Sequence, residues 1–566
     1  MRSNRGIILV LCMLLIADIG YLLYPLVQHT SIDNAMQQFN ITTSVPMWIA
    51  LAIFGLMWLM LEIDVRRQKQ TNAHGSAHYA THKEAKSFLH HTFLRRRKTN
   101  KSSKSSLLVL GKYKQQIISL TEKQQESNIL LTASIGAGKS SRVIIPNLLL
   151  EKGSRSLFVS DAKGELSRLT SGAVARYHEV WIFAPMSPRE SASYNPLRFI
   201  QTVEDAQELA ACWVSNTGKS EEQFWANVAK KLMVAVMLHL KEAEPDAAFS
   251  RVADMLCSLT YEELKSALLT SPSRAAKNEI RTFFDYLALN PKLIGSVMTD
   301  ISSRFQLLVS DQVKAVTTRN DIDFAAMTAH PIALYLSIPR RYAERYQPLL
   351  ACFMMQMFSV WEQIASTTGQ LPRGIMCYLD EFANLGYIPN ISGYISTARS
   401  SRIALLIVLQ SFNQLDEKYG QEVRKNILSQ TTTHLLLSGA GIEETEYYSQ
   451  RIGNSTIQKA TESFSGESLL NNTVSRTKDE TGRRLLMSDE IRTMSTDRML
   501  MIPSTSAPIL LQTTPYFLDR SLKDLTQIPP PKQKGSLLMP QEHSARRQEK
   551  MKEEIEGKEQ QFFLDE

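Results

Sequence analysis

Two long apolar runs stand near the start of the chain, at residues 6–27 and 45–61. Their lengths lie near the roughly 20 residues that an α-helix needs to cross a bilayer. A cleavable signal peptide and buried core helices are the alternatives. Asp18 inside the first run and the presence of a second run argue against a signal peptide. We therefore predict a membrane anchor at residues 1–70 with two transmembrane helices.

Basic residues flank this pair of runs, preceding the first and following the second. They are Arg2, Arg5, Arg66, Arg67 and Lys69. The loop between the runs carries only Asp33 as a formal charge. Because basic flanks stay on the cytoplasmic side of a membrane, both termini and the main part of the chain are expected to be cytoplasmic, at the cell (inner) membrane.

After this anchor, short apolar runs alternate with helical patterns. Strand-like runs at residues 128–134, 156–166 and 179–186 surround a glycine turn and helices, which is the opening of a doubly wound α/β sheet. Between residues 201 and 322 the apolar residues recur at spacings of three and four, which predicts an all-α domain. Strand-like runs then resume and are expected to complete the sheet; they lie at 331–338, 374–382, 403–411 and 434–439.

Composition limits the classes of protein that fit. The 566 residues exceed one ordinary domain, and 43% hydrophobic with 21% charged residues indicates a mostly globular chain. The net charge of +8 suits an anionic partner, either nucleic acid or acidic lipid, or serves general solubility. The five cysteines include no C-x-x-C pair and no His at metal-ligand spacing, so we expect neither a structural metal nor disulfides.

The glycine turn at residues 133–141 resembles a phosphate-binding loop, G-x-x-x-x-G-K-[ST], except that Ala133 replaces the first glycine. Its residues are Ala133, Ser134, Ile135, Gly136, Ala137, Gly138, Lys139, Ser140 and Ser141. In such a loop the lysine reaches the β- and γ-phosphates, and the following hydroxyl, here Ser140, binds Mg²⁺. A small residue fits the first position if its φ is negative. The loop therefore predicts ATP and Mg²⁺ as cofactors.

Two further segments carry candidate chemistry. Asp380 and Glu381 follow an apolar run; a carboxylate there binds Mg²⁺, and the adjacent one is placed to polarise the attacking water. Gln410 ends the next run and is a candidate γ-phosphate sensor. Arg399 is a candidate arginine finger acting across a subunit interface, although pairing with a local acid or with DNA would also explain it.

Seven motifs occur in one order between residues 75 and 515. They are "GSAHYATHKEA" (75–85), "VIIPNLL" (143–149) after the loop, "SDAKGEL" (160–166), "SASYNPL" (191–197), "FWANVAKKLM" (224–233), "LDEFANLG" (379–386) and "LQSFNQL" (409–415). With two N-terminal membrane runs, the chain resembles the type IV secretion coupling proteins of the VirD-type/TraG family.

The resemblance implies a RecA-like P-loop ATPase domain at residues 71–200 and 323–525, interrupted by the all-α domain at 201–322. Residues 526–566 are expected to form a flexible charged tail. The resemblance also implies a homo-hexameric ring at the membrane that recruits a relaxase–single-stranded DNA complex to a type IV secretion channel and helps to export it during conjugation.

The same resemblance assigns roles by position. Lys139 and Ser140 take the phosphate and Mg²⁺ roles, and Asp380 and Glu381 take the strand-end acid roles. Gln410 matches the sensor and Arg399 the candidate finger. Asp161 and Lys163 fall in "DAKGE", where the family usually has D-P-K-G-E.

Other functions remain open from the sequence. A coupling ATPase for protein effectors would share all the nucleotide chemistry, and a non-hydrolysing membrane receptor would keep the loop as a relic. A double-strand DNA translocase is a weaker alternative, because "SASYNPL" and the two N-terminal runs fit coupling proteins better.

Overall fold

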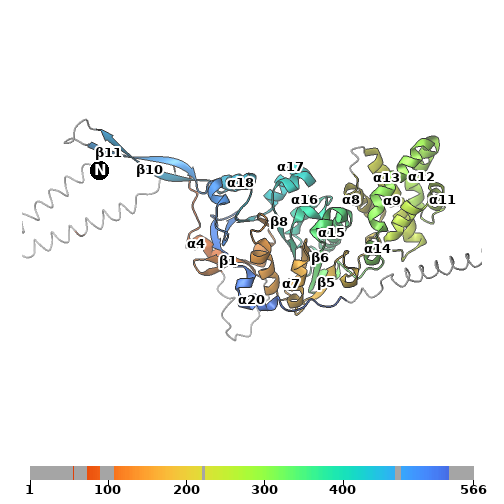
Figure 1. The fold of residues 1–566 in the computed structure, drawn as a ribbon, viewed down its shortest axis with the longest axis horizontal. Coiled ribbons are helices and arrows are strands. Elements are labelled where there is room, and N and C mark those ends of the chain that lie inside the picture. Colours follow the sequence, from red (N-terminus) through yellow and green to blue (C-terminus); the bar gives the residue numbers. More distant parts are fainter. Residues whose placement is uncertain (1–54, 56–72, 90–106, 219–222, 466–472, 534–566) are drawn as a thin grey trace, which may run out of the picture. The chain divides into compact units, whose positions relative to one another are not determined.

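The computed structural model describes residues 73–89, 107–218, 223–465 and 473–533, together with Gly55 (Figure 1). The two predicted membrane segments lie outside the described residues, apart from Gly55. Among the described residues no helix is both long and apolar enough to span a bilayer.

The chain divides into two compact units. The first comprises Met1–Ser76 and Thr456–Gly482, and the second Ala77–Ser455 and Arg483–Glu566. Strands β10 (Asn454–Ser465) and β11 (Thr473–Arg484) form a two-stranded sheet. The larger second unit holds all the candidate residues of the nucleotide site.

An eleven-stranded sheet forms the centre of the second unit, in the order β2-β1-β13-β12-β9-β3-β8-β7-β4-β6-β5. The strands from β9 to β5 run parallel, whereas β12, β13, β1 and β2 extend the sheet by antiparallel pairing. The strands are β1 (Leu108–Tyr113), β2 (Gln116–Leu120), β3 (Ile129–Thr132), β4 (Ser156–Asp161), β5 (Glu179–Phe183), β6 (Ile332–Ser337), β7 (Ile375–Leu379), β8 (Ile403–Leu409), β9 (Thr433–Leu437), β12 (Arg498–Pro503) and β13 (Ile509–Gln512).

The central strands β3, β4, β6, β7, β8 and β9 are buried at every residue and mostly apolar, because both faces of the sheet are covered. Alternate residues of one strand enter two different hydrophobic clusters. In β3, Leu130 belongs to one cluster, whereas Ile129 and Leu131 belong to the other. The predicted α/β sheet is thus confirmed, with helices packed on both faces.

Seven of the described helices lie in the segments that connect one strand to the next along the chain. They are α5 (Glu122–Gln125), α6 (Ile145–Leu150), α7 (Glu165–Val174), α15 (Arg340–Thr368), α16 (Ile391–Ala398), α17 (Asn413–Gln430) and α18 (Ile442–Ile452). The remaining short helices are α4 (His82–Ala85), α19 (Ser488–Arg492) and α20 (Arg520–Leu525).

Between β5 and β6 the described residues contain helices and no strand. These helices are α8 (Val203–Ser215), α9 (Gln223–Ala243), α10 (Ser250–Ala253), α11 (Tyr261–Leu269), α12 (Arg274–Leu289), α13 (Ile294–Val309) and α14 (Asp311–Thr317). α9, α11, α12 and α13 form a group of their own, drawn in green in Figure 1. α8 packs against both α9 and α15, so it joins this group to the helices of the sheet.

Part of the predicted tail is packed in the second unit. The backbone N–H of Ile182 in β5 donates to the side chain of Gln533 at 3.1 Å. Gly172 in α7 lies so close to the carbonyl of Ile528 that a Cβ on it would be 2.2 Å from that oxygen. Ile528 therefore lies against α7 and Gln533 against the edge strand β5, and the tail beyond residue 533 falls outside the described residues.

Candidate nucleotide site

The carboxyl edge of the parallel strands brings the candidate loop and the candidate acids together. β3 leads into the loop, β7 ends before Asp380, and β8, which lies between them in the sheet, ends before Gln410. Parallel strands present all their carboxyl ends at one edge, which is where ligands bind in open α/β sheets.

The loop has the backbone that a phosphate cradle needs. Gly136 and Gly138 have φ of +82° and +87°, which only glycine adopts readily. Ala133 is not among the described residues with positive φ; it is fully buried, and its N–H donates to Leu409 O at 3.0 Å. The alanine therefore satisfies the condition under which it can replace the usual glycine.

Neighbouring segments hold this loop in place. Ser134 Oγ donates to the carbonyl of Ser438 at 3.1 Å. Arg142 Nη1 donates to both the carbonyl and the hydroxyl of Thr513, each at 3.2 Å. The helix opens with a wide π-turn at Ser140–Ile144 before α6. Pro146 has no N–H to donate, so a regular α-helical bond at that position is excluded.

Lys139 is buried between the two strand-end acids. Its Nζ lies 3.4 Å from Asp380 Oδ1 and 3.6 Å from Glu381 Oε1, and the three side chains are 9%, 5% and 3% exposed. Within the described part of the chain, neither Lys139 Nζ nor Asp380 Oδ1 makes a hydrogen bond. The two atoms face each other as an ion pair without a well-aligned hydrogen bond, which leaves both of them able to bind a ligand.

The charge balance at this point favours a divalent cation. Burial raises the pKa of Asp380, the charge of Lys139 lowers it, and the neighbouring carboxylates of Glu381 and then Asp161 raise it further. The single positive charge of Lys139 is thus outnumbered by the carboxylates around it in a buried site. Mg²⁺ prefers carboxylate and hydroxyl oxygens, so Asp380 and Ser140, which follows Lys139 in the chain, are donors of the kind that fits this ion.

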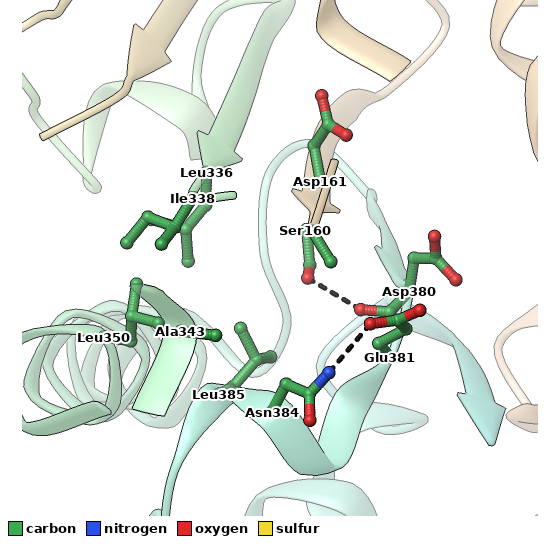
Figure 2. Close-up of a pocket in the computed structure, with 11 residues that line it drawn as sticks. Ser160, Asp161, Leu336, Ile338, Ala343, Leu350, Asp380, Glu381, Asn384 and Leu385 are labelled. Atoms are coloured by element: carbon green, nitrogen blue, oxygen red, sulfur yellow. Dashed lines mark hydrogen bonds between the residues drawn. The ribbon is translucent and has the colours of Figure 1, made fainter. Parts of the chain in front are cut away.

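Glu381 is held in a defined orientation by two amide side chains. Gln410 Nε2 donates to Oε1 at 2.7 Å, and Asn384 Nδ2 donates to Oε2 at 2.8 Å. Glu381 itself has φ +51°, a left-handed conformation that is uncommon outside glycine. Such strained residues cluster at functional sites. Figure 2 shows Asn384 pointing at the Glu381 carboxylate from the short helix Phe382–Leu385.

A small cavity adjoins this carboxylate. Its volume is about 20 Å³, which is enough for one water molecule. Asp380, Glu381 and Asn384 line one side, and Leu336, Ile338, Ala343, Leu350 and Leu385 line the opposite, apolar side (Figure 2).

The structure places the other predicted residues differently. Asp161 is buried, and its Oδ2 accepts from the N–H and the hydroxyl of Ser167, both at 2.8 Å, so it caps the start of α7. Lys163 is exposed. Arg399 follows α16 and precedes β8, so it lies at the amino edge of the sheet, away from the loop of its own chain.

Burial and then the charge of Glu122 raise the pKa of Glu126, which precedes β3, and the charges of Arg402, Arg155 and, least, Arg399 lower it. Arg399 therefore acts near that acid at the amino edge, and the described structure does not bring it to Lys139.

Two neighbours of Glu381 were not predicted from the sequence. Asn384 is one; the other is Arg340, whose Nε lies 4.0 Å from Glu381 Oε2 at the start of α15 with its side chain 52% exposed. Arg340 stands just beyond the carboxyl end of β6, and a polar residue in that position was the available signal.

A parallel sheet with a phosphate loop and two strand-end acids at its carboxyl edge defines a P-loop nucleotide-binding fold. The family model for the type IV secretory system, conjugative DNA transfer, matches residues 80–553, and the chain belongs to this family. Protein VirD4 of Rhizobium radiobacter is 26% identical over 426 residues, which covers 74% of this chain and 60% of that protein. The chain thus spans about three-fifths of the length of this curated relative.

Other relatives agree with this assignment. Coupling protein TraD of Escherichia coli (strain K12) is 22% identical over 379 residues, covering 65% of this chain and 49% of TraD. Among solved structures, the plasmid coupling protein TrwB in complex with a non-hydrolysable ATP analogue has a TM-score of 0.54 at 14% identity, covering 78% of this chain and 93% of that one. This last likeness establishes a shared fold.

Proposed function

We propose that the protein is a membrane-anchored coupling ATPase, which binds ATP with Mg²⁺ and uses its hydrolysis to help export single-stranded DNA through a type IV secretion channel. The observation that carries this proposal is the contact of Lys139 with Asp380 and Glu381 in a buried site that leaves Lys139 Nζ and Asp380 Oδ1 without hydrogen bonds. The TrwB complexes with ADPNP and with ADP and Mg²⁺ support the same ligands here.

The residues divide the work of hydrolysis. Backbone N–H groups of the loop and the Lys139 ammonium bind the phosphates, and the Ser140 hydroxyl and the Asp380 carboxylate would hold Mg²⁺. When bound there, the ion would supply positive charge next to the phosphates. Glu381 accepts a hydrogen bond from the attacking water and raises its nucleophilicity, while Gln410 fixes Glu381 and senses the γ-phosphate.

The remaining parts of the proposal concern assembly. The segments at 6–27 and 45–61 anchor the chain in the cell membrane, with both termini and the main domains cytoplasmic. A homo-hexameric ring receives the relaxase–single-stranded DNA complex at the all-α domain, residues 201–322. Arg399, which is distant from the loop of its own chain, completes the site of a neighbouring subunit.

The test is ATP turnover by the full-length protein in lipid, with and without single-stranded DNA. We expect DNA-stimulated turnover in the wild type and none in Lys139→Ala or Glu381→Gln. Nucleotide binding without turnover under any DNA condition would contradict hydrolysis and support a receptor. Turnover that ignores DNA but responds to a secreted protein would support a coupling ATPase for protein effectors.

A further inference from the structure

Asn384 links the Glu381 carboxylate to a segment that lies against the helical region. Its Nδ2 donates to Glu381 Oε2 at 2.8 Å, and its own N–H donates to the Glu381 carbonyl, also at 2.8 Å. The chain then continues through Leu385 and Gly386 to Tyr387. A displacement of this segment therefore moves one of the two amides that orient Glu381.

The Asn216 side chain, at the end of α8, is hydrogen-bonded to the backbone of the same segment. Its Oδ1 accepts from Tyr387 N at 2.7 Å, and its Nδ2 donates to Tyr387 O and to Cys212 O, each at 2.8 Å. The Asn216 amide thus makes two hydrogen bonds to the Tyr387 backbone, and a third to a carbonyl group of α8, the helix that it ends.

Gly386 makes this approach possible. It has φ +89°, and a Cβ there would lie 2.6 Å from Asn216 Oδ1. A side chain at this position would therefore be strained and would push the Asn216 amide away. Tyr419 adds a second fixing point, because its hydroxyl donates to the Gly386 carbonyl at 3.0 Å.

The end of α8 is itself fixed by the helical region. Arg304 in α13 is buried, and its Nη1 donates to Thr217 O at 2.6 Å, one residue beyond Asn216. Trp213 Nε1 donates back to Arg304 O at 3.2 Å. α13 and the end of α8 are therefore joined by direct hydrogen bonds, which continue through Asn216 to Tyr387.

We propose that Asn384 is a positioning residue for Glu381, and that the Asn216 amide couples it to α8 and α13. A ligand that binds to the helices between β5 and β6, or a force that acts on them, then changes the orientation of the Glu381 carboxylate. This proposal rests on the proposed function, because it assigns Glu381 a role toward water. Coupling between two sites is reciprocal, so nucleotide in the loop must also change the state of the α8 end.

The test is hydrogen exchange of the full-length protein with and without a non-hydrolysable ATP analogue. The variants are Asn384→Ala, Asn216→Ala and, as a matched control, Asn290→Ala. Asn290 ends α12 and donates to Tyr286 O at 2.9 Å in the way that Asn216 donates to Cys212 O, but it is not hydrogen-bonded to the Tyr387 segment. Steady-state kinetics are recorded in parallel.

In the wild type we expect the analogue to change exchange both at residues 385–388 and at residues 213–217. Asn216→Ala should keep the change at 385–388 and lose it at 213–217, with basal kcat unchanged. Asn384→Ala should lose both changes and lower kcat by up to about 100-fold, at unchanged affinity for the analogue. Asn290→Ala should match the wild type.

Two results would overturn the coupling. One is a wild type that binds the analogue without any change at residues 213–217. The other is an Asn384→Ala variant that retains both changes or the wild-type kcat. Failure of the analogue to bind at all would instead refute the proposed function, and the coupling with it.

Discussion

Gln410 and Glu381 follow neighbouring parallel strands, and the Gln410 amide donates to the Glu381 carboxylate at 2.7 Å. The same carboxylate oxygen lies 3.6 Å from Lys139 Nζ of the phosphate loop. One carboxylate thus contacts both the lysine of the loop and the glutamine at the end of the neighbouring strand, which is the arrangement that the proposed function needs to couple nucleotide state to hydrolysis.

The first prediction concerns Glu381→Gln, which keeps the size of the side chain and removes its basicity. Turnover should fall by about 10²–10⁴-fold, the usual contribution of a positioned base. The affinity for a non-hydrolysable ATP analogue should stay within a few-fold of the wild type. Phosphate release and analogue titration measure the two quantities.

Glu422→Gln is the control for that variant, because Glu422 is exposed and distant from the loop in the sequence, with its side chain 85% exposed. It should behave as the wild type. Equal turnover in Glu381→Gln and Glu422→Gln would exclude Glu381 from the reaction.

The second prediction ranks substitutions in the phosphate loop. Ala133→Gly should leave nucleotide affinity nearly unchanged. Ala133 is not among the described residues with positive φ, so a glycine there would relieve no backbone strain. Gly136→Ala adds a Cβ in open space at φ +82°, so it costs about 1–2 kcal/mol of backbone strain. Gly138→Ala adds the same strain and places a Cβ 2.8 Å from Arg142 Nε.

The affinities for ATP should therefore fall in the order Ala133→Gly, Gly136→Ala, Gly138→Ala, as measured by isothermal titration. A marked gain in affinity in Ala133→Gly would show instead that the missing glycine weakens the natural site.

The third prediction concerns the pH dependence of stability. Burial lowers the pKa of His434 from 6.5 to about 4, and the side chain is fully buried beside Thr431. Below pH 6.5 the unfolded chain binds a proton at this residue that the folded chain does not bind. The free energy of unfolding should therefore decrease as pH falls, with His434 contributing about 2 kcal/mol of the loss between pH 7 and pH 5.

Chemical denaturation of His434→Gln across this range should show a shallower loss of stability than the wild type. His178 and His239, whose pKa values burial also lowers, leave part of the slope in place. Substitution of the exposed His82 serves as the control. An unchanged slope in His434→Gln would show that His434 titrates normally in the folded chain.

The fourth prediction tests whether Arg399 acts between subunits. Because Arg399 lies at the amino edge of the sheet, Arg399→Ala and Glu381→Gln should each be inactive alone and regain turnover when mixed. In a mixed ring, an intact Glu381 would meet an intact Arg399 at some interfaces.

A mixture of Lys139→Ala with Glu381→Gln is the matched control. Both changes lie in the site of one chain, where Lys139 and Glu381 are 3.6 Å apart, so no interface combines them into an intact site. Equal recovery in the two mixtures, or none in the first, would remove Arg399 from a role across the interface.

The sequence alone predicted the parts of the site that lie directly after apolar strands. Lys139, Asp380, Glu381 and Gln410 each follow such a run, and the parallel sheet brings their strand ends to one edge. The distances between these side chains are known only from the structure. A pattern of strands predicts the edge of the sheet at which residues meet, but not how far apart their side chains lie.

Other features depended on information that is not local in the sequence. Strand β1 pairs with β13 near the other end of the chain, with Lys112 opposite Gln512, and the two runs carry no signal of that pairing. Asn384 is hydrogen-bonded to Glu381, whose φ of +51° is not predicted by its residue type. Arg399 was proposed as a finger from its place before an apolar run and from the resemblance, and the single chain does not bring it to the loop.

The most direct measurement of the central claim is DNA transfer from donor cells in which the native copy is replaced by the wild type, Glu381→Gln or Glu422→Gln. If hydrolysis at this site drives export, Glu422→Gln will transfer DNA at the wild-type frequency, and Glu381→Gln will lose transfer while its protein level stays the same. Transfer by Glu381→Gln donors at the wild-type frequency would contradict the account.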